Sequence, residues 1–208
     1  MKLIKVAAGV LNQTPRDWKG NLTNILDAIK QAQAQNASIL CLPEMCITGY
    51  GLEDDYFCLD VGKRAILKLK EICSHTRNLI VNVGLPIVFN NTLYNATAII
   101  VDEKVIGFRC KESLANDGIH YESRWFKPWP KGVSQIIDIP ELEGKFPIGD
   151  IKWDDIREVE SLEAFAEKMN KRVVEIGSKK PTHWVESHSI AVTDMQGKPS
   201  GMHFVISN

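Results

Sequence analysis

A short apolar run that ends abruptly in a proline and an acid constrains the fold of this chain most strongly. The run from Ile39 to Leu42 has the character of a strand that is buried on both faces. Pro43 interrupts it, because a proline cannot donate a hydrogen bond to a sheet. Glu44 then follows at the carboxyl end of the strand, where open α/β sheets place their functional groups. Glu44 is therefore a candidate general base, and the alternative is a strand-end carboxylate that points into water.

The residues before this run predict another strand and a helix. The largely apolar segment from Leu3 to Val10 predicts a first, internal strand. After a turn at residues 14–17, Asn21 is expected to cap a helix that Asn36 ends. The apolar stripe of this helix consists of Leu22, Ile25, Leu26, Ile29 and Ala32. A strand, a helix and a strand within about 40 residues form a βαβ unit, so the two strands should be parallel.

The pattern of strands and helices continues to about residue 150. In order, it predicts a helix around 66–73, a strand over 79–85 that Pro86 stops, a hairpin over 94–109, a strand over 136–139 and a short connection over 141–150. This order predicts an α/β fold in which a sheet carries helices on one face.

Two polar segments interrupt the pattern. Residues 51–60 contain the acids Glu53, Asp54 and Asp55, which are expected to face solvent. Residues 114–130 have neither a helical nor a strand period, and they combine aromatic rings, prolines and charged groups. A segment of this length and composition predicts an ordered functional loop.

The composition bounds the class of protein. With 208 residues, 44% of them hydrophobic, the chain can form one domain with a substantial core but not two large ones. The net charge of −1 argues against nucleic acid or a membrane surface as the main partner. The five cysteines are odd in number and lie in the first 110 residues, as expected for reduced thiols of a cytoplasmic protein. A membrane span and a signal peptide are not expected.

Two motifs in this sequence resemble the glutaminase domain of glutamine-dependent NAD synthetases, a member of the nitrilase superfamily. The first motif is Pro43-Glu44 with the turn Thr48-Gly49-Tyr50. The second consists of Lys111, the segment from Leu114 to Gly118, Tyr121, and the segment from Arg124 to Trp129. The resemblance runs from about residue 3 to Asp150, so residues 1–150 are expected to form the glutaminase core.

The resemblance implies a nitrilase-like αββα sandwich and a Glu-Lys-Cys amidohydrolase site. Glu44 would be the general base that activates a thiol, and Lys111 would stabilise the oxyanion of the tetrahedral intermediate. Glu122 would support both of them. The alternative for Lys111 is a surface lysine at a strand edge. The residues that would shape the glutamine pocket are Tyr50, Tyr121 and Phe126.

The nucleophilic cysteine that the family places after the Phe146–Asp150 connection does not occur, because no cysteine follows Cys110. Cys46 is the best substitute by its distance along the chain from Glu44. Cys110 and Lys111 are neighbours on one strand and should point to opposite faces. The alternative for both cysteines is a buried bystander, and Ser113 is a weaker candidate.

Residues 151–208 are expected to form the divergent or truncated C-terminal half of the same domain, so the sandwich would be incomplete or altered after residue 150. A helix over 154–171 and strands over 184–193 and 202–206 are predicted. Natural divergence, deletion, frameshift and fusion all remain open as origins. If an internal strand is missing, the exposed sheet edge would need cover or a partner chain. His183, His188 and His203 lack the spacing and acidic neighbours of a metal site, so no metal is expected.

Two functional hypotheses follow from the resemblance. The first is a glutamine amidohydrolase domain that supplies ammonia for NAD biosynthesis, and the second is a catalytically inactive nitrilase-like module for binding or assembly. The sequence has no Ser-Gly-Gly-x-Asp-Ser phosphate loop, so no cofactor is expected in this domain. ATP, the NAD precursor and the ligase activity would belong to a synthetase domain. The expected partners are glutamine and either such a synthetase domain or further copies of this chain.

Overall fold

The computed structural model of this protein describes residues 5–151, 189–193 and 199–205. Its helices are α1 (Trp18–Ala34) and α2 (Leu59–Cys73), with short 3-10 turns η1 (Glu53–Phe57), η2 (Glu122–Arg124) and η3 (Pro140–Leu142). Its strands are β1 (Val6–Ala8), β2 (Ile39–Cys41), β3 (Ile80–Phe89), β4 (Thr92–Val101), β5 (Lys104–Cys110), β6 (Ser134–Ile139), β7 (Gly144–Gly149), β8 (Ser189–Thr193) and β9 (Pro199–Val205).

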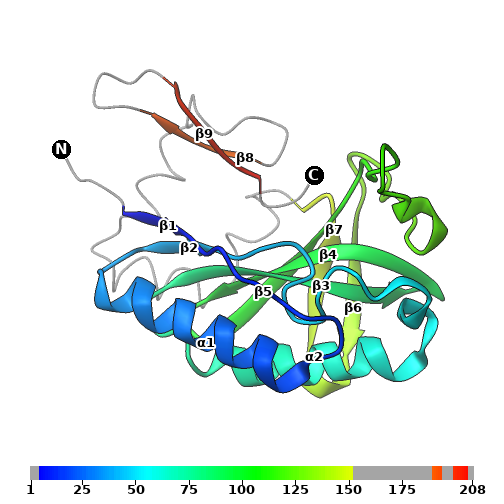
Figure 1. Cartoon of the computed structure of the whole chain (residues 1–208), viewed down its shortest axis with the longest axis horizontal. Helices are drawn as coiled ribbons and strands as arrows, with labels where there is room; N and C mark the ends of the chain where they lie inside the picture. The colour runs from blue at the N-terminus through cyan, green and yellow to red at the C-terminus, as the bar shows by residue number, and fades with distance from the viewer. Residues whose placement is uncertain (1–4, 152–188, 194–198, 206–208) are drawn as a thin grey trace.

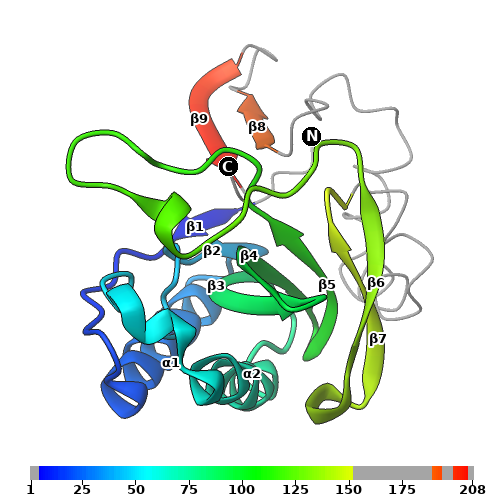
Figure 2. The same ribbon diagram turned by 90° about the vertical axis from the view of Figure 1, so that its right-hand side faces the viewer.

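Seven of the strands form one mixed sheet in the order β1-β2-β3-β4-β5-β7-β6. The strands β1, β2 and β3 are parallel, and the βαβ pattern predicted this for β1 and β2. The hairpins β3–β4 and β4–β5 are antiparallel, β7 pairs in parallel with β5, and β6 forms the edge. Helices α1 and α2 lie side by side on one face of this sheet (Figures 1 and 2). The predicted α/β fold with helices on one face is confirmed.

The main core fills the space between the sheet and the two helices. On the helices it consists chiefly of Leu22, Ile25, Ile29, Ala65, Ile66, Leu69 and Ile72. On the central strands it consists of Val81, Val83, Leu85, Ala96, Ala98, Ile100, Phe108 and Cys110. Because successive strand residues point to opposite faces, Asn95 and Lys111 belong to the face away from the helices. The core therefore fixes which polar groups can meet on that other face.

Helix α1 begins earlier than the sequence indicated. Asp17 is the N-cap, because its carboxylate accepts a hydrogen bond of 2.9 Å from the Gly20 N–H. Asn21 was predicted to be the cap, but it lies inside the helix and is 1% exposed. Its side-chain amide instead donates to the carbonyl oxygens of Thr14 and Ile47. Asn21 thus ties the helix to the turn that follows Glu44.

Strand β3 does not stop at Pro86 as expected. It continues to Phe89, and Pro86 lies opposite Asn95 in β4. The Asn95 carbonyl oxygen accepts from the Lys111 N–H, so the backbone of Asn95 is engaged with the β5 side. On the other side, β2 pairs with β3 only as far as Asn82. A proline is tolerated here because no neighbouring strand needs its missing N–H.

Residues 141–150 were predicted to be a short connection, but they contain the strand β7. Glu143 adopts a left-handed conformation with φ 57° and turns the chain back from η3, so that β7 pairs antiparallel with β6. The strand contains Gly144, Pro147 and Gly149, and these residue types are uncommon in strand interiors. Because of these residues, the sequence pattern did not indicate a strand here.

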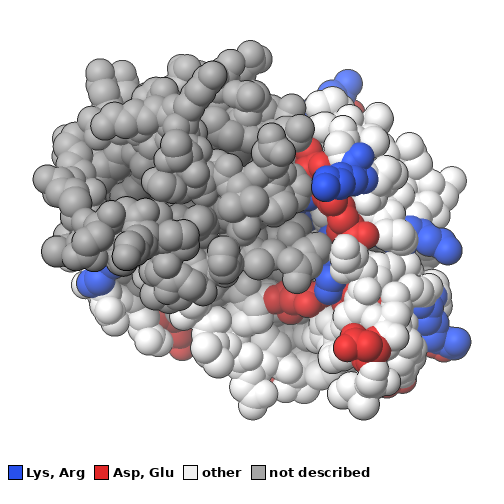
Figure 3. All heavy atoms as spheres, turned by 90° about the horizontal axis from the view of Figure 1, so that it is seen from above, with Lys and Arg blue, Asp and Glu red and all other residues white. Residues whose placement is uncertain are grey.

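The first strand is shorter than the predicted segment 3–10, since β1 covers Val6–Ala8. Strands β8 and β9 pair antiparallel. β8 lies within the predicted strand 184–193, whereas β9 begins at Pro199, three residues before the predicted strand 202–206. The predicted helix over 154–171 and the residues His183 and His188 lie outside the described residues. In the part of the chain that the structure describes, no helix is long and apolar enough to cross a membrane. Figure 3 shows acidic and basic side chains interspersed over the described part of one face.

Candidate active site

Glu44 lies in a tight turn directly after β2, as the sequence predicted. The turn is anchored by hydrogen bonds from the Gly49 N–H to the Met45 carbonyl oxygen and from the Ile47 N–H to that of Gly84. A Cβ atom at Gly84 would lie 2.4 Å from the Met45 nitrogen, so only glycine lets β3 approach the turn this closely. The side chain of Glu44 itself is 40% exposed. The turn is thus fixed while its carboxylate remains accessible.

Lys111 follows β5 and brings an ammonium group to this carboxylate. Its Nζ lies 2.8 Å from Glu44 Oε1 and 3.0 Å from Glu122 Oε2. Its side chain is 10% exposed, so the ammonium group is largely withdrawn from water. Lys111 is therefore part of a buried charge cluster, which argues against the alternative of a surface lysine.

Glu122 begins η2 and is fully buried. Its carboxylate accepts hydrogen bonds from the Ala115 N–H at 2.7 Å and from the Tyr50 hydroxyl at 2.9 Å. Burial acts to raise the pKa of Glu122, but these two donors and Lys111 outweigh it and hold the pKa below its usual range. Glu122 is thus a permanent carboxylate at neutral pH.

The three groups form a cluster that we call the acid–lysine site: Glu44, Lys111 and Glu122. Burial acts to lower the pKa of Lys111, but the hydrogen bonds and charges of both carboxylates reverse this and raise it. The lysine is therefore a fixed cation and cannot act as a base. The hydrogen bonds that the described residues make to Glu44 end on Oε1, which leaves Oε2 available to take a proton. The chemistry that this permits is proton abstraction beside a positive group that can stabilise a developing oxyanion.

The predicted pocket residues have different surroundings. Tyr50 joins the site through its hydrogen bond to Glu122, and its pKa is raised by burial and by the neighbouring carboxylates. Phe126 is 1% exposed and packs on Tyr56 with ring centres 4.7 Å apart. Tyr121 is 49% exposed and packs against Trp125 with the two rings tilted by 40°. Of the three, the structure brings Tyr50 into direct contact with the acid–lysine site.

Glu53 and Asp54 are exposed as expected, whereas Asp55 is half-buried, and both aspartates form ion pairs. Asp54 accepts from Nε and Nη2 of Arg124, both at 2.7 Å, and from the indole of Trp125. These hydrogen bonds lower the pKa of Asp54 to about 2. Asp55 pairs with Arg16 at 3.0 Å. The cyan segment with η1 and the green loop with η2 therefore lie side by side (Figure 2).

Two residues near the site were missed by the sequence reasoning. His120 Nδ1 lies 3.5 Å from the Tyr50 hydroxyl, and the two rings meet edge to face. Asn95 donates through Nδ2 to the carboxylates of both Glu44 and Glu122. A signal for Asn95 was present, because it is a polar residue at the start of the apolar part of β4, and a buried polar group requires a partner.

The cysteines closest in sequence to the site are directed into the core. Cys46 is fully buried, and its Sγ lies 3.8 Å from the carbonyl oxygen of Gly84. Cys110 belongs to the core cluster beneath the helices, on the opposite face from Lys111. Burial raises the pKa of both thiols to about 12. This geometry favours the alternative in which both cysteines are bystanders.

Alkylation should distinguish the cysteines of the folded protein. Cys58 is exposed, whereas Cys41, Cys46, Cys73 and Cys110 are wholly or partly buried and have a pKa raised to about 12. Since the thiolate is the reactive form, iodoacetamide at pH 8 should label Cys58 first. Peptide mass spectrometry after a short pulse would measure this order. Equally rapid labelling of Cys46 would show that its thiol is accessible and would restore it as a nucleophile.

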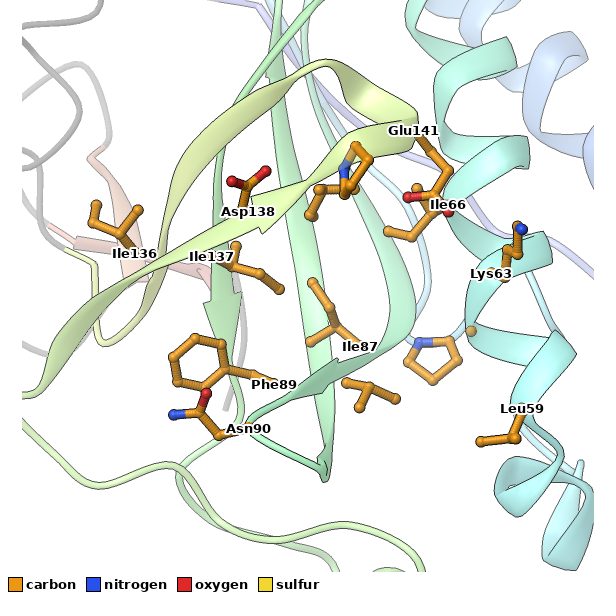
Figure 4. A pocket seen from close by; sticks show the side chains of 15 residues that line it. Leu59, Lys63, Ile66, Ile87, Phe89, Asn90, Ile136, Ile137, Asp138 and Glu141 are labelled. Atoms are coloured by element: carbon orange, nitrogen blue, oxygen red, sulfur yellow. The ribbon is translucent and has the colours of Figure 1, made fainter.

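A groove of about 530 Å³ lies on the helix side of the sheet, between α2, the end of β3 and β6 (Figure 4). Its walls are mainly apolar, with Leu59, Ile66, Ile87, Phe89 and Ile137 among the lining residues, and Lys63, Asp138 and Glu141 contribute charges. The acid–lysine site lies elsewhere, at the ends of β2 and β5.

Comparison with known proteins identifies the family. The family model for carbon-nitrogen hydrolases matches residues 5–152. The chain belongs to this family. The match ends near residue 150, where the resemblance was expected to end. The structure of an amidase from Nesterenkonia sp. has a similar fold, with a TM-score of 0.53 at 20% identity over 65% of this chain and 51% of that one.

The similar curated proteins are glutamine-dependent NAD(+) synthetases. The protein of Oryza sativa subsp. indica is 37% identical over 131 residues, which are 62% of this chain and 18% of that protein. The human protein is 32% identical over 163 residues, 73% of this chain and 23% of its own length. A synthetase structure from Cytophaga hutchinsonii has a TM-score of 0.69 at 41% identity, over 71% of this chain and 25% of that one. The predicted resemblance and the nitrilase-like fold are confirmed, and the chain spans about a fifth of the length of these curated relatives.

Proposed function

We propose that this carbon-nitrogen hydrolase chain acts on glutamine as a glutaminase domain of the NAD synthetase type. The observation that carries the proposal is the convergence of Glu44, Lys111 and Glu122 from three separate segments within hydrogen-bonding distance. The resemblance to glutamine-dependent NAD synthetases supports glutamine as the substrate. The ammonia released would serve NAD biosynthesis.

Each group has a definite part in this proposal. Glu44 takes the proton of a thiol, and the resulting thiolate attacks the amide carbon of glutamine. The ammonium group of Lys111 stabilises the negative charge that develops on the amide oxygen. Glu44 returns the proton to the departing nitrogen, so that the tetrahedral intermediate expels ammonia. Water then hydrolyses the thioester, which yields glutamate and regenerates the thiol. Glu122 holds Lys111 in place, and Tyr50 forms one wall of the substrate pocket.

The second candidate is an inactive nitrilase-like module for binding or assembly. It is favoured by the burial of Cys46 and Cys110 on the core side of the sheet. In this case the acid–lysine site would bind the glutamine amide without cleaving it. Position along the chain favours Cys46 as the thiol of the first candidate, whereas its burial favours the second.

A glutamine hydrolysis assay with the full chain decides between the two. An active wild type should release glutamate and ammonia, and Glu44→Gln should lower kcat/KM by about 10²- to 10⁴-fold, because general-base catalysis contributes an effect of that size. Glu71→Gln is the matched control, since Glu71 is an exposed acid on α2 that pairs with Lys68. Cys46→Ala tests the thiol. Absence of turnover, together with absence of covalent labelling by an electrophilic glutamine analogue, would reject hydrolysis and leave the binding module.

The wider setting of the chain is also part of the proposal. ATP and the NAD precursor would bind to a synthetase domain, which would supply the ligase activity. The chain would associate with that domain or with further copies of itself. The free cysteines support a reducing, cytoplasmic location.

A further inference from the structure

Asn95 makes hydrogen bonds to all three members of the acid–lysine site. Its side-chain Nδ2 donates to Glu44 Oε1, and also to Glu122 Oε1 at 3.2 Å. Its backbone carbonyl oxygen accepts from the Lys111 N–H at 2.8 Å. It is 4% exposed and belongs to β4, which is paired on both sides by β3 and β5. Asn95 is thus a fixed point from which the whole site can be held.

An amide is suited to this place for an electrostatic reason. Two carboxylates lie around a single ammonium group, so among the residues that the structure describes one negative charge at the site has no matching cation. A neutral amide has two N–H donors and can stabilise both carboxylates without adding charge. A carboxylate at this position would add a third negative charge, and an alkyl side chain would supply no donor.

The two carboxylates differ in how strongly they depend on this amide. Glu122 also accepts from Lys111, Tyr50 and the Ala115 N–H. Glu44 is the exposed residue of an otherwise buried turn, and within the described residues its side chain is held by Lys111 and Asn95. The conformation of Glu44 should therefore be sensitive to loss of Asn95. Asn95 and Lys111 both donate to Oε1 of Glu44. They thereby fix the orientation of the carboxylate and leave Oε2 without a hydrogen bond from either of them.

We propose that Asn95 is a positioning residue, which fixes Glu44 against Lys111 and adds a donor that helps to keep Glu122 ionised beside them. What the positioned base acts on rests on the proposed function, but the positioning itself does not. This assigns to β4 a part in the site that the Glu-Lys-Cys pattern leaves out. A residue with only a structural role in β4 would stabilise the strand without affecting the ionisation of Glu122.

Titration of the Glu122 carboxyl carbon by NMR tests this inference without any need for turnover. In Asn95→Ala, the pKa of Glu122 should rise by about 1, because one hydrogen bond to a charged carboxylate is lost. In Asn95→Asp it should rise further, because a like charge is added. Thr97→Val is the matched control, since Thr97 lies two residues along β4, is 5% exposed and hydrogen-bonds to Asn82. A titration of Glu122 in both Asn95 variants identical to that of the wild type would overturn the proposal.

A measurement on the unmodified protein covers the case in which a variant fails to fold. The side-chain NH₂ resonances of Asn95 should change with pH at the same midpoint as the carboxyl carbon of Glu122. Asn95 resonances that stay constant through that midpoint would contradict the hydrogen bond between the Asn95 amide and the Glu122 carboxylate. Glutamine titration gives a separate result: if the wild type does not bind glutamine while the Asn95 effects hold, the proposed function is rejected and the positioning role stands.

Discussion

Lys111→Met should lower the free energy of unfolding by about 3 kcal/mol, because it leaves the fully buried Glu122 without its cation. Loss of one partner from a buried ion pair costs about 3–5 kcal/mol. The lower end is expected here, since the Ala115 N–H and the Tyr50 hydroxyl still donate to the Glu122 carboxylate. Methionine fills a similar volume, so the effect reports the charge more than the packing. Urea denaturation at pH 7 measures it.

An exposed lysine provides the control for this substitution. Lys70 lies 2.7 Å from Glu143, but the two side chains are 51% and 79% exposed. Lys70→Met should therefore change the free energy of unfolding very little, as for other surface ion pairs. Similar costs for the two variants would mean that the acid–lysine site is as well solvated as the surface. The double variant Lys111→Met with Glu122→Gln should recover part of the loss, because no buried charge remains unpaired.

The effect of Lys111→Met should also depend on pH. In the wild type, the folded-state pKa of Glu122 lies below its unfolded value of about 4.3. Its contribution to stability is therefore complete above that pH and is lost as the pH falls through the folded-state value. In the variant, the unpaired Glu122 favours protonation, so acid relieves the destabilisation. The stability difference between the two proteins should shrink from pH 7 toward pH 4, and a constant difference would contradict this explanation.

The sequence predicted the parts of this fold that depend on local pattern. The apolar periodicity of α1 and the run at Ile39 each matched an element, and their order predicted the parallel unit. The errors occurred where tertiary contacts override local preference. Pro86 is tolerated in β3 because neither neighbouring strand needs the backbone N–H that proline lacks. The side chain of Asn21 donates a hydrogen bond to the carbonyl oxygen of Ile47, which is distant in sequence. A local pattern contains neither fact.

The site shows the same division. Glu44 and Lys111 were recognised because each follows a strand and belongs to a motif, and the structure places them 2.8 Å apart. Asn95 was missed because it belongs to neither of the two recognised motifs. It contributes to the site through hydrogen bonds to segments that are distant along the chain. Its polarity in an apolar strand was a signal, but its partners become evident only when the register of β3, β4 and β5 is known.

Arg109→Met should lower the free energy of unfolding by about 3–5 kcal/mol, because the arginine forms buried ion pairs where β5 meets the end of β7. Its side chain is 2% exposed, and Nη1 lies 2.8 Å from Asp150 Oδ1 and 2.9 Å from the Gly149 carbonyl oxygen. Its Nη2 pairs with Glu112. The register between β5 and β7 covers only Phe108 with Ile148 and Arg109 with Gly149. The side chain of Arg109 therefore supplies contacts that so short a strand pairing cannot.

Hydrogen exchange would locate the damage, since the loss should fall first on the hairpin β6–β7, which joins the rest of the sheet through β5. Arg109→Lys should be intermediate, because lysine keeps the charge but not the planar fork that reaches two acids and a carbonyl oxygen. Lys145→Met is the control on β7 itself, because Lys145 lies 3.9 Å from Asp138 and both side chains are exposed. A uniform loss of protection across all strands in Arg109→Met would contradict a local role of Arg109 at the junction of β5 and β7 and would indicate a general loss of core stability. Selective loss of protection in β6 and β7 would show that β7, the strand that the sequence did not predict, depends on the buried side chain of Arg109.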